Sequence, residues 1–346
     1  MLLSDYNYIL PEELIAQTPA SERTHSKMMV LDKTAETIEH RHFFDILDYL
    51  GENDVLVLND TKVIPARLFG QKTTGAKVEV FLLKDMGNRQ WEALIKPSKR
   101  VNPDNIIKIS NELIVKTLVR LDGGKWLVEL IYEGDIYEIL DRIGNVPLPP
   151  YIERKIPDEK LKSLDYSRYQ TVFACHAGSV AAPTAGLHFS KEIIKQLNDK
   201  GVQICYVTLN VGLGTFRPVK CENILEHKMD MESFEISAKT AEIINKAKKS
   251  GKNIVAAGTT SVRTLETAFQ KYGEIRACKD TSQLFIYPPY DFKVVDKLIT
   301  NFHLPKSTLL MLVSAFSDRN FVLKAYKQAI ESKYRFYSYG DCMFIH

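Results

Sequence analysis

A change of pattern near residue 66, reversed near residue 152, constrains the fold more than any other feature of the chain. Between these positions, turn residues such as Asp122-Gly123-Gly124 separate short runs that are rich in β-branched and apolar residues. The runs cover residues 77–83, 91–95, 106–109, 113–121 and 126–131. Five or so short strands at near-regular spacing predict a small antiparallel barrel or sandwich.

The chain on either side of this block alternates between strand and helix patterns. Before it, residues 28–31 and 55–58 are typical of buried strands, with an amphipathic helix expected between them at 43–50. After it, we expect helices at 190–200, 238–250, 262–270, 307–316 and 321–332, and strands at 202–209, 253–257 and 342–345. The sequence therefore predicts an α/β fold, in which a large mixed-sheet α/β domain is interrupted by a small antiparallel β-barrel-like insert.

The domain boundaries follow from the same change of pattern. We expect residues 1–65 and 153–346 to form one discontinuous α/β catalytic domain, and residues 66–152 to form the inserted β-barrel domain. The insert ends at the proline-rich segment 147–150, and the charged stretch 153–168 that follows is typical of an exposed linker.

Composition excludes several classes of protein. With 45% hydrophobic and 26% charged residues, the 346-residue chain is neither disordered nor dependent on disulfides for its core. Its five cysteines include no C-x-x-C pair, so we expect reduced thiols and no metal site. The N-terminus lacks the pattern of a secretion signal. The longest apolar stretch, residues 309–316, is far shorter than the roughly 20 residues of a membrane span. We expect a soluble cytoplasmic protein with no membrane partner.

The net charge of +3 is small, but its distribution is uneven. Residues 66–152 contain 13 Lys/Arg and 11 Asp/Glu, so the expected insert carries +2 of the total. Within it, Lys96, Lys99 and Arg100 fall in a span of five residues. Local clusters of this kind bind phosphate backbones, and these three residues are candidate nucleic-acid contacts. An ordinary solvated turn is the alternative interpretation.

Four segments outside the insert combine small or polar residues with positions after strands or before helices. Small side chains and helix N-termini let backbone N–H groups approach a ligand, and loops that follow the strands of one α/β layer converge into a pocket. The candidate substrate-binding residues are Pro183, Thr184, Ala185, Gly186, Gly212, Gly214, Thr215, Thr259, Thr260, Arg263, Asn301 and Lys306. Tight packing, plain turns and N-capping are the alternatives.

The same segments resemble the motifs of one enzyme family. The matching stretches are Ala182-Pro-Thr-Ala-Gly-Leu-His-Phe189, Gly212-Leu-Gly-Thr-Phe-Arg-Pro-Val219, Gly258-Thr-Thr-Ser-Val-Arg-Thr-Leu265 and Thr300-Asn-Phe-His-Leu-Pro-Lys-Ser-Thr-Leu-Leu-Met311, together with residues 58–67, 147–152 and 334–341. In collinear order from Tyr8 to Ile345, they resemble the S-adenosylmethionine:tRNA ribosyltransferase-isomerase family of queuosine biosynthesis.

The resemblance implies a specific reaction. Such an enzyme transfers and isomerises the ribosyl part of S-adenosylmethionine onto 7-aminomethyl-7-deazaguanine at the wobble position of tRNA with a GUN anticodon. The products are epoxyqueuosine-tRNA, adenine and methionine. S-Adenosylmethionine is then a consumed substrate and no cofactor is expected; a monomer is expected.

The reaction needs a base to remove a proton beside the sulfonium and an acid to assist the departure of adenine. A histidine before a helix, such as His303, could exchange protons or could be purely structural. The candidate catalytic residues are His188, His227, Glu232 and His303, with their roles unassigned.

The sequence lacks a histidine of the family pattern at two positions. A histidine usually precedes the Val-Gly-x-Gly-Thr-Phe motif, where this chain has Asn210. Another usually follows His-Lys-Met, where this chain has Asp230. Asn does not titrate, and the carboxyl of an exposed Asp has a pKa near 3.9 rather than the 6.5 of histidine. Two alternatives follow: a divergent paralogue that acts on another nucleoside, or a tRNA-binding module without catalysis.

Overall fold

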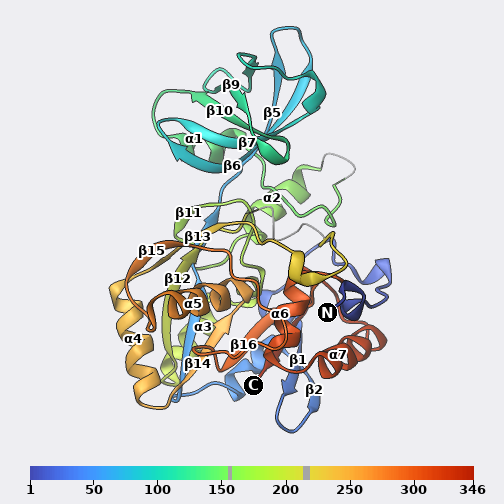
Figure 1. Cartoon of the computed structure of the whole chain (residues 1–346), viewed down its shortest axis with the longest axis vertical. Coiled ribbons are helices and arrows are strands. Elements are labelled where there is room, and N and C mark those ends of the chain that lie inside the picture. Colours follow the sequence, from blue (N-terminus) through green and yellow to red (C-terminus); the bar gives the residue numbers. More distant parts are fainter. Residues whose placement is uncertain (155–157, 213–218) are drawn as a thin grey trace.

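A nine-stranded mixed sheet forms the larger part of the protein, and a closed six-stranded barrel lies above it in Figure 1. The computed structural model describes residues 1–154, 158–212 and 219–346, with the backbone alone for Arg100. Across the sheet the strands lie in the order β15 (Cys278–Ser282), β13 (Glu232–Ile236), β12 (Gln203–Leu209), β3 (Asp54–Asn59), β14 (Asn253–Ala257), β16 (Lys297–Asn301), β17 (Cys342–Ile345), β1 (Lys27–Asp32) and β2 (Thr37–His42).

The four strands at the centre of the sheet, β12, β3, β14 and β16, are mutually parallel. Towards one edge, β13 and β15 each add in the antiparallel sense. Towards the other edge, β17 runs antiparallel to β16 and parallel to β1, and β2 closes that edge. The carboxyl ends of the central strands therefore face one way, which is where α/β sheets place their ligands.

Helices cover both faces of this sheet. All six residues of β3 are buried, with Val55 and Val57 on one face and Leu56 and Leu58 on the other. Strands covered on both faces have near-continuous hydrophobic runs rather than alternating ones. The first face packs against α4 (Ala238–Lys249), α5 (Thr259–Tyr272), α6 (Thr308–Phe316) and α7 (Arg319–Glu331), and the second against α3 (Lys191–Asp199) and the 3₁₀ helix Phe43–Asp48.

The barrel is antiparallel throughout and has a hydrophobic core of its own. In barrel order, its strands are β10 (Lys125–Ile131), β7 (Gln90–Lys96), β6 (Lys77–Gly87), β5 (Arg67–Lys72), β8 (Ile106–Lys108) and β9 (Ile114–Arg120). Helix α1 (Ile136–Ile143) packs Ile139 and Leu140 against this core. An antiparallel bridge joins Arg67, where the chain enters the barrel, to Asn145, where it leaves.

The predicted fold class is confirmed, and several of the expected elements are found within a few residues of their predicted ends. The 43–50 segment is a 3₁₀ helix rather than an α-helix, with Phe43 and Ile46 buried one three-residue turn apart. Strands β5 and β16 were not predicted. A short parallel pair, β4 (Thr61–Val63) with β11 (His176–Ser179), lies near the point where the chain enters the barrel.

The stretch 153–168 is exposed at most of its described residues, as expected, but most of it is a helix rather than a linker without regular structure. Residues 159–168 form α2 (Glu159–Arg168), which begins where the Asp158 carboxylate accepts backbone N–H bonds from Lys160 and Leu161. Within the helix, Asp165 is buried and accepts two 2.7 Å hydrogen bonds from the Arg154 guanidinium. It also accepts a 2.9 Å bond from the Tyr339 hydroxyl, which ties the helix to the C-terminal part of the chain.

Candidate active site

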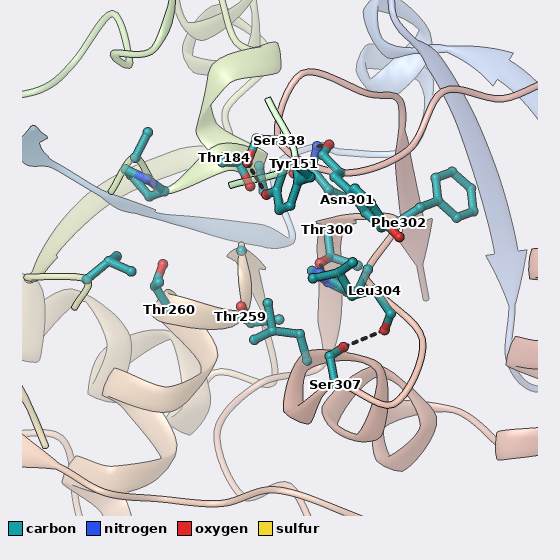
Figure 2. A pocket seen from close by; sticks show the side chains of 18 residues that line it. Tyr151, Thr184, Thr259, Thr260, Thr300, Asn301, Phe302, Leu304, Ser307 and Ser338 are labelled. Atoms are coloured by element: carbon teal, nitrogen blue, oxygen red, sulfur yellow. Dashed lines mark hydrogen bonds between the residues drawn. The ribbon is translucent and has the colours of Figure 1, made fainter. Parts of the chain in front are cut away.

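One pocket lies at the carboxyl edge of the four parallel strands (Figure 2). The residues that follow β11, β12, β14 and β16 all contribute to its walls. The pocket encloses about 650 Å³ of empty space, with open solvent at its mouth included. Seven of the residues predicted to bind substrate or to catalyse line it: Pro183, Thr184, Ala185, Thr259, Thr260, Asn301 and His303.

Gly258 brings two of these segments together. It connects β14 to α5 with a φ of 90°, a backbone conformation that glycine adopts without strain. A Cβ at this position would lie 3.5 Å from Cβ of Ala185, so the loop after β11 packs closely on the start of the helix. Thr259 and Thr260 follow in the first turn of α5, and the Thr260 hydroxyl is buried without a hydrogen-bond partner among the residues that the structure describes. The pocket wall therefore contains an unsatisfied polar group.

Asn301 forms a second polar point on the wall. Its Nδ2 atom lies 3.1 Å from Nε2 of His188 and donates a 3.1 Å bond to the Tyr337 carbonyl. Its Oδ1 atom is buried and has no hydrogen-bond partner in the described part of the chain. Both ring nitrogens of His188 are occupied, because Nδ1 lies 2.7 Å from the Ser26 hydroxyl. With Nε2 accepting from the amide, Nδ1 carries the proton and donates to Ser26.

Burial dominates the chemistry of both histidines near this edge. Desolvation lowers the pKa of His188 to about 3, and the positive charges of Arg335 and Arg23 act in the same direction. Desolvation likewise lowers the pKa of His303 to about 3. His303 lines the pocket, with Nε2 at 2.7 Å from the Thr300 hydroxyl and its backbone N–H bonded to the Tyr326 hydroxyl. Both imidazoles are therefore neutral at pH 7.

Three pocket residues, Tyr151, Tyr337 and Ser338, were not predicted as site residues. The Tyr151 hydroxyl lies 2.6 Å from Oγ of Ser338, and the rings of Tyr151 and Tyr337 have centroids 4.7 Å apart. They come from the 147–152 and 334–341 motifs. These motifs contribute to the family resemblance, but no pattern of residues within them indicates a ligand-binding site. Figure 2 shows Tyr151 and Ser338 on the opposite side of the pocket from Thr259.

A second cavity lies between the barrel and the sheet. Its sheet side is formed by Gly178 and by residues at the ends of β12 and β13, among them Asn210, Asp230 and Glu232. Its barrel side includes Trp91 and Lys125, and its empty space is about 1330 Å³, open solvent included. Val211 lines this cleft and the pocket alike, so the two cavities are neighbours. Both positions at which the chain departs from the family pattern therefore face the same cleft.

A buried ion pair lies at the edge of the cleft. Glu232 and Arg263 are each 4% exposed in their side chains, and Oε2 of Glu232 bonds Nη1 of Arg263. Oε1 of Glu232 accepts a 2.9 Å bond from the backbone N–H of Gly212. Nε of Arg263 donates to the Leu284 carbonyl, while its Nη2 has no hydrogen-bond partner within the described ranges. The pair fixes the start of the 212 loop against β13 and α5.

Comparison with known proteins identifies the family. A sequence profile described as queuosine biosynthesis protein matches residues 3–345. The chain belongs to the queuosine biosynthesis protein family. It is 55% identical to the S-adenosylmethionine:tRNA ribosyltransferase-isomerase of a Sulfurihydrogenibium species over 346 residues, which is 100% of both chains. It is 51% identical to the enzyme of the same name from Fusobacterium nucleatum, covering 99% of this chain and 97% of that one.

Among solved structures, the chain is similar to the S-adenosylmethionine tRNA ribosyltransferase of Thermotoga maritima. The two share 36% identity and a TM-score of 0.56, and the match covers 99% of this chain and 100% of that one. The family resemblance noted from the motifs is thus confirmed along the whole chain.

The other predicted residues that the structure describes in this queuosine biosynthesis family member do not line the pocket. Gly186 serves packing, because a Cβ there would lie 2.8 Å from Cγ2 of Thr171. Lys306 is exposed at the start of α6, and His227 packs its ring against Phe285 at 5.3 Å between centroids. Desolvation lowers the pKa of His227, while the charge of Asp230 opposes that shift. Gly214 and Thr215 lie outside the described residues.

The predicted tRNA contacts lie on the barrel. Lys96 is exposed at the end of β7, and Lys99 is exposed in the 3₁₀ turn Ser98–Arg100 that follows. The side chain of Arg100 lies outside the described part of the structure. Within the described ranges, no group of three or more His, Cys, Asp or Glu side chains is placed to hold a metal ion. No helix in the same ranges is long and apolar enough to cross a membrane.

Proposed function

We propose that this chain transfers and isomerises the ribosyl group of S-adenosylmethionine onto 7-aminomethyl-7-deazaguanine at the wobble position of tRNA, giving epoxyqueuosine-tRNA, adenine and methionine. The observation that carries the proposal is a pair of buried oxygens on the wall of the sheet-edge pocket, Oδ1 of Asn301 and Oγ1 of Thr260, which have no hydrogen-bond partner among the described residues. Buried polar atoms in native proteins are nearly always hydrogen-bonded, so a polar ligand in this pocket would satisfy them.

S-Adenosylmethionine suits this pocket because it carries several hydrogen-bonding groups and a flat base. Its ammonium group and its adenine amine can each donate a hydrogen bond to the oxygens of Asn301 and Thr260. The rings of Tyr151 and Tyr337 supply an aromatic wall for adenine. The molecule enters as a consumed substrate, and this chain uses no separate cofactor in the reaction.

The wobble nucleotide would then enter through the cleft beside the barrel. Since Val211 lines both cavities, a base in the cleft would lie next to a sugar in the pocket. We propose residues 66–152 as a separate domain that holds the tRNA, and residues 1–65 with 153–346 as the catalytic domain. Tight binding of a tRNA with a GUN anticodon, action as a monomer and a cytoplasmic location are parts of the same proposal.

The site residues divide into groups that meet the substrate and groups that position them. Neutral His303 lines the pocket, and its Nδ1 makes no hydrogen bond with a described residue. When Nε2 donates to the Thr300 hydroxyl, Nδ1 can accept a hydrogen bond from the bound ribose. His188 has both nitrogens engaged and acts through Asn301, whose amide it orients. Glu232 holds the Gly212 backbone where the two cavities meet.

The decisive assay is direct. The protein is incubated with S-adenosylmethionine and with tRNA that carries the aminomethyl-deazaguanine, and adenine and methionine are quantified by chromatography. Both products are expected to appear with the same stoichiometry as modified tRNA. No adenine release at saturating concentrations of both substrates would refute the proposal.

A matched pair of variants tests the pocket assignment. Thr260→Val deletes the buried, unpartnered hydroxyl in the pocket, and Thr171→Val deletes one that lies outside it. Loss of a neutral hydrogen bond to ligand costs about 0.5–1.5 kcal/mol, so Thr260→Val should weaken S-adenosylmethionine binding roughly 2- to 12-fold. Neither change should lower the stability of the free protein, because neither hydroxyl is bonded there. Equal affinities for the two variants in calorimetric titration would contradict the assignment.

A second candidate function is favoured by Asn210 and Asp230, which both face the cleft. A nucleoside other than the aminomethyl-deazaguanine would suit a divergent paralogue with these side chains. Release of adenine in the presence of tRNA that lacks the modified base, at a rate equal to that with modified tRNA, would support this reading over the first. A non-catalytic tRNA-binding module would instead bind tRNA with an affinity that is independent of S-adenosylmethionine.

A further inference from the structure

The outer face of the barrel presents an exposed aromatic ring in a row with a carboxylate and a cation. Phe69 is 53% exposed on β5. It lies opposite Glu79 of β6, which in turn lies opposite Lys96 of β7. Residues directly opposite one another in antiparallel strands point to the same face of the sheet. Phe69, Glu79 and Lys96 therefore stand side by side on the outside of the barrel.

A second row lies one pair further along the same strands. Gln71 of β5 lies opposite Lys77 of β6 on one side and opposite Lys108 of β8 on the other. Lys77, Lys96 and Lys108 are all exposed, and none forms an ion pair with a described residue. We call the surface formed by Phe69, Lys77, Lys96 and Lys108 the barrel platform.

Glu79, the carboxylate that lies between Phe69 and Lys96, is already neutralised by an arginine. Glu79 accepts two bonds from the Arg67 guanidinium, at 2.9 Å to Nε and 3.2 Å to Nη2. Cζ of Arg67 lies 5.3 Å from the centre of the Phe69 ring. The acid therefore does not cancel the charge of the lysines, and it helps to hold a guanidinium beside the exposed ring.

The Phe69 ring projects from a part of the barrel in which two strands pack closely together. Gly70 follows Phe69, and a Cβ there would lie 2.6 Å from the backbone oxygen of Lys108 and 2.7 Å from Cδ1 of Ile109. Strands β5 and β8 can approach this closely only because residue 70 has no side chain. The groove beside this contact is lined by Phe69, Gln71, Lys77 and Lys108.

We propose that the barrel platform binds single-stranded RNA, with one base stacked on Phe69 and the phosphates beside it contacting Lys77, Lys96 and Lys108. An exposed aromatic ring among unpaired cations is the arrangement by which proteins hold unpaired nucleotides. This inference rests on the proposed function, because the RNA is the anticodon loop of the tRNA substrate.

The platform is continuous with the cleft that would receive the wobble base. Lys77, Glu79, Phe81 and Leu83 alternate along the outer face of β6, and Leu83 lines the cleft. Glu79, which lies opposite Phe69, and Leu83 are four residues apart, and four residues of antiparallel strand span about 14 Å. A few nucleotides of the loop can cover that distance, so one loop can place its wobble base in the cleft and a neighbouring base on Phe69.

The test is the affinity for a 17-nucleotide anticodon stem-loop RNA, measured by fluorescence anisotropy with the full chain. Phe69→Ala should raise the Kd roughly 5- to 150-fold, the effect of losing one base–aromatic stack. Phe69→Trp should retain binding. Val119→Ala, which truncates a side chain that is 48% exposed on β9, is the matched control and should leave the Kd unchanged.

A blunt RNA duplex of the same length separates stacking from charge. Phe69→Ala should leave its Kd unchanged, whereas Lys77→Ala should weaken both RNAs and lower the salt dependence of binding by about one counterion. A Phe69→Ala variant that binds the stem-loop as tightly as the unchanged protein, or that loses duplex binding equally, overturns the inference. The binding assay does not require catalysis. Failure of adenine release would refute the proposed function, whereas a loss of affinity that is confined to the stem-loop would still support RNA binding by the platform.

Discussion

Acid is expected to destabilise this protein through the buried histidines of the site, and His188 allows the size of the effect to be worked out. Burial, with help from Arg335 and Arg23, lowers its pKa to about 3 in the folded state, against about 6.5 in an unfolded chain. The unfolded state therefore takes up the proton first. The contribution of His188 to stability is complete above pH 6.5 and is lost as the pH falls from 6.5 towards 3.

Each pH unit within that window costs about 1.4 kcal/mol per histidine. His188 should thus remove about 1.4 kcal/mol of the free energy of unfolding at pH 5.5 and about 2.7 kcal/mol at pH 4.5. His303, whose pKa burial also lowers to about 3, should remove a similar amount. Asp341 acts in the opposite direction, because burial raises the pKa of its carboxyl. A comparison of variants is therefore needed to isolate the histidine.

Urea unfolding at pH 7.0, 5.5 and 4.5 measures the effect. His188→Gln should lower stability at pH 7.0, since it disturbs the bonds to Ser26 and Asn301. Between pH 7.0 and 4.5, however, it should lose about 2.7 kcal/mol less than the unchanged protein. His25→Gln, which removes a half-exposed histidine, is the control and should follow the unchanged protein. If His188→Gln loses as much stability on acidification as the unchanged protein, the reasoning is refuted.

Three further outcomes follow from the site and the barrel. Glu232→Gln leaves the buried Arg263 charge without its partner and should lower the free energy of unfolding by about 3–5 kcal/mol in urea; a loss below about 1 kcal/mol would mean that the pair is not maintained in solution. Asn210→His combined with Asp230→His should raise the turnover of modified tRNA, because imidazole titrates near neutral pH, and unchanged turnover would show that these positions do not limit the reaction. Lys99→Ala should weaken tRNA binding and reduce its salt slope by about one, whereas an unaltered slope would remove Lys99 from the interface.

The sequence predicts those parts of the fold that depend on local patterns. The run 55–58 is apolar at every position because β3 is covered on both faces, and that pattern needs no tertiary knowledge. The segments that start at 211 and 258 follow strands that were predicted, and their meeting at one edge was predictable from that connection alone. The place of the 301 segment beside them was not, because β16 was not predicted. The antiparallel barrel also follows from short strands at regular spacing.

Features that depend on contacts between distant segments could not be predicted. Tyr151 and Ser338 reach the pocket from segments 187 residues apart in the sequence, and no spacing links them. The α2 segment is rich in Lys, Asp and Ser, and its attachment to the rest of the protein depends on the contact of Asp165, its one buried residue, with Arg154 and Tyr339. The cleft that Asn210, Asp230 and Glu232 face exists only because the barrel is placed beside the sheet.

The bridge between Arg67 and Asn145 has a consequence for how the chain folds. The backbone N–H of each residue bonds the carbonyl of the other, at 3.1 and 2.9 Å, so the chain leaves the sheet and returns to it at a single point. Residues 68–144 therefore connect two paired residues, as the loop of a hairpin connects the ends of its two strands. Once the barrel has formed, the entropic cost of joining β3 to the later strands no longer includes its length. A barrel that folds early would thus speed, rather than delay, assembly of the nine-stranded sheet.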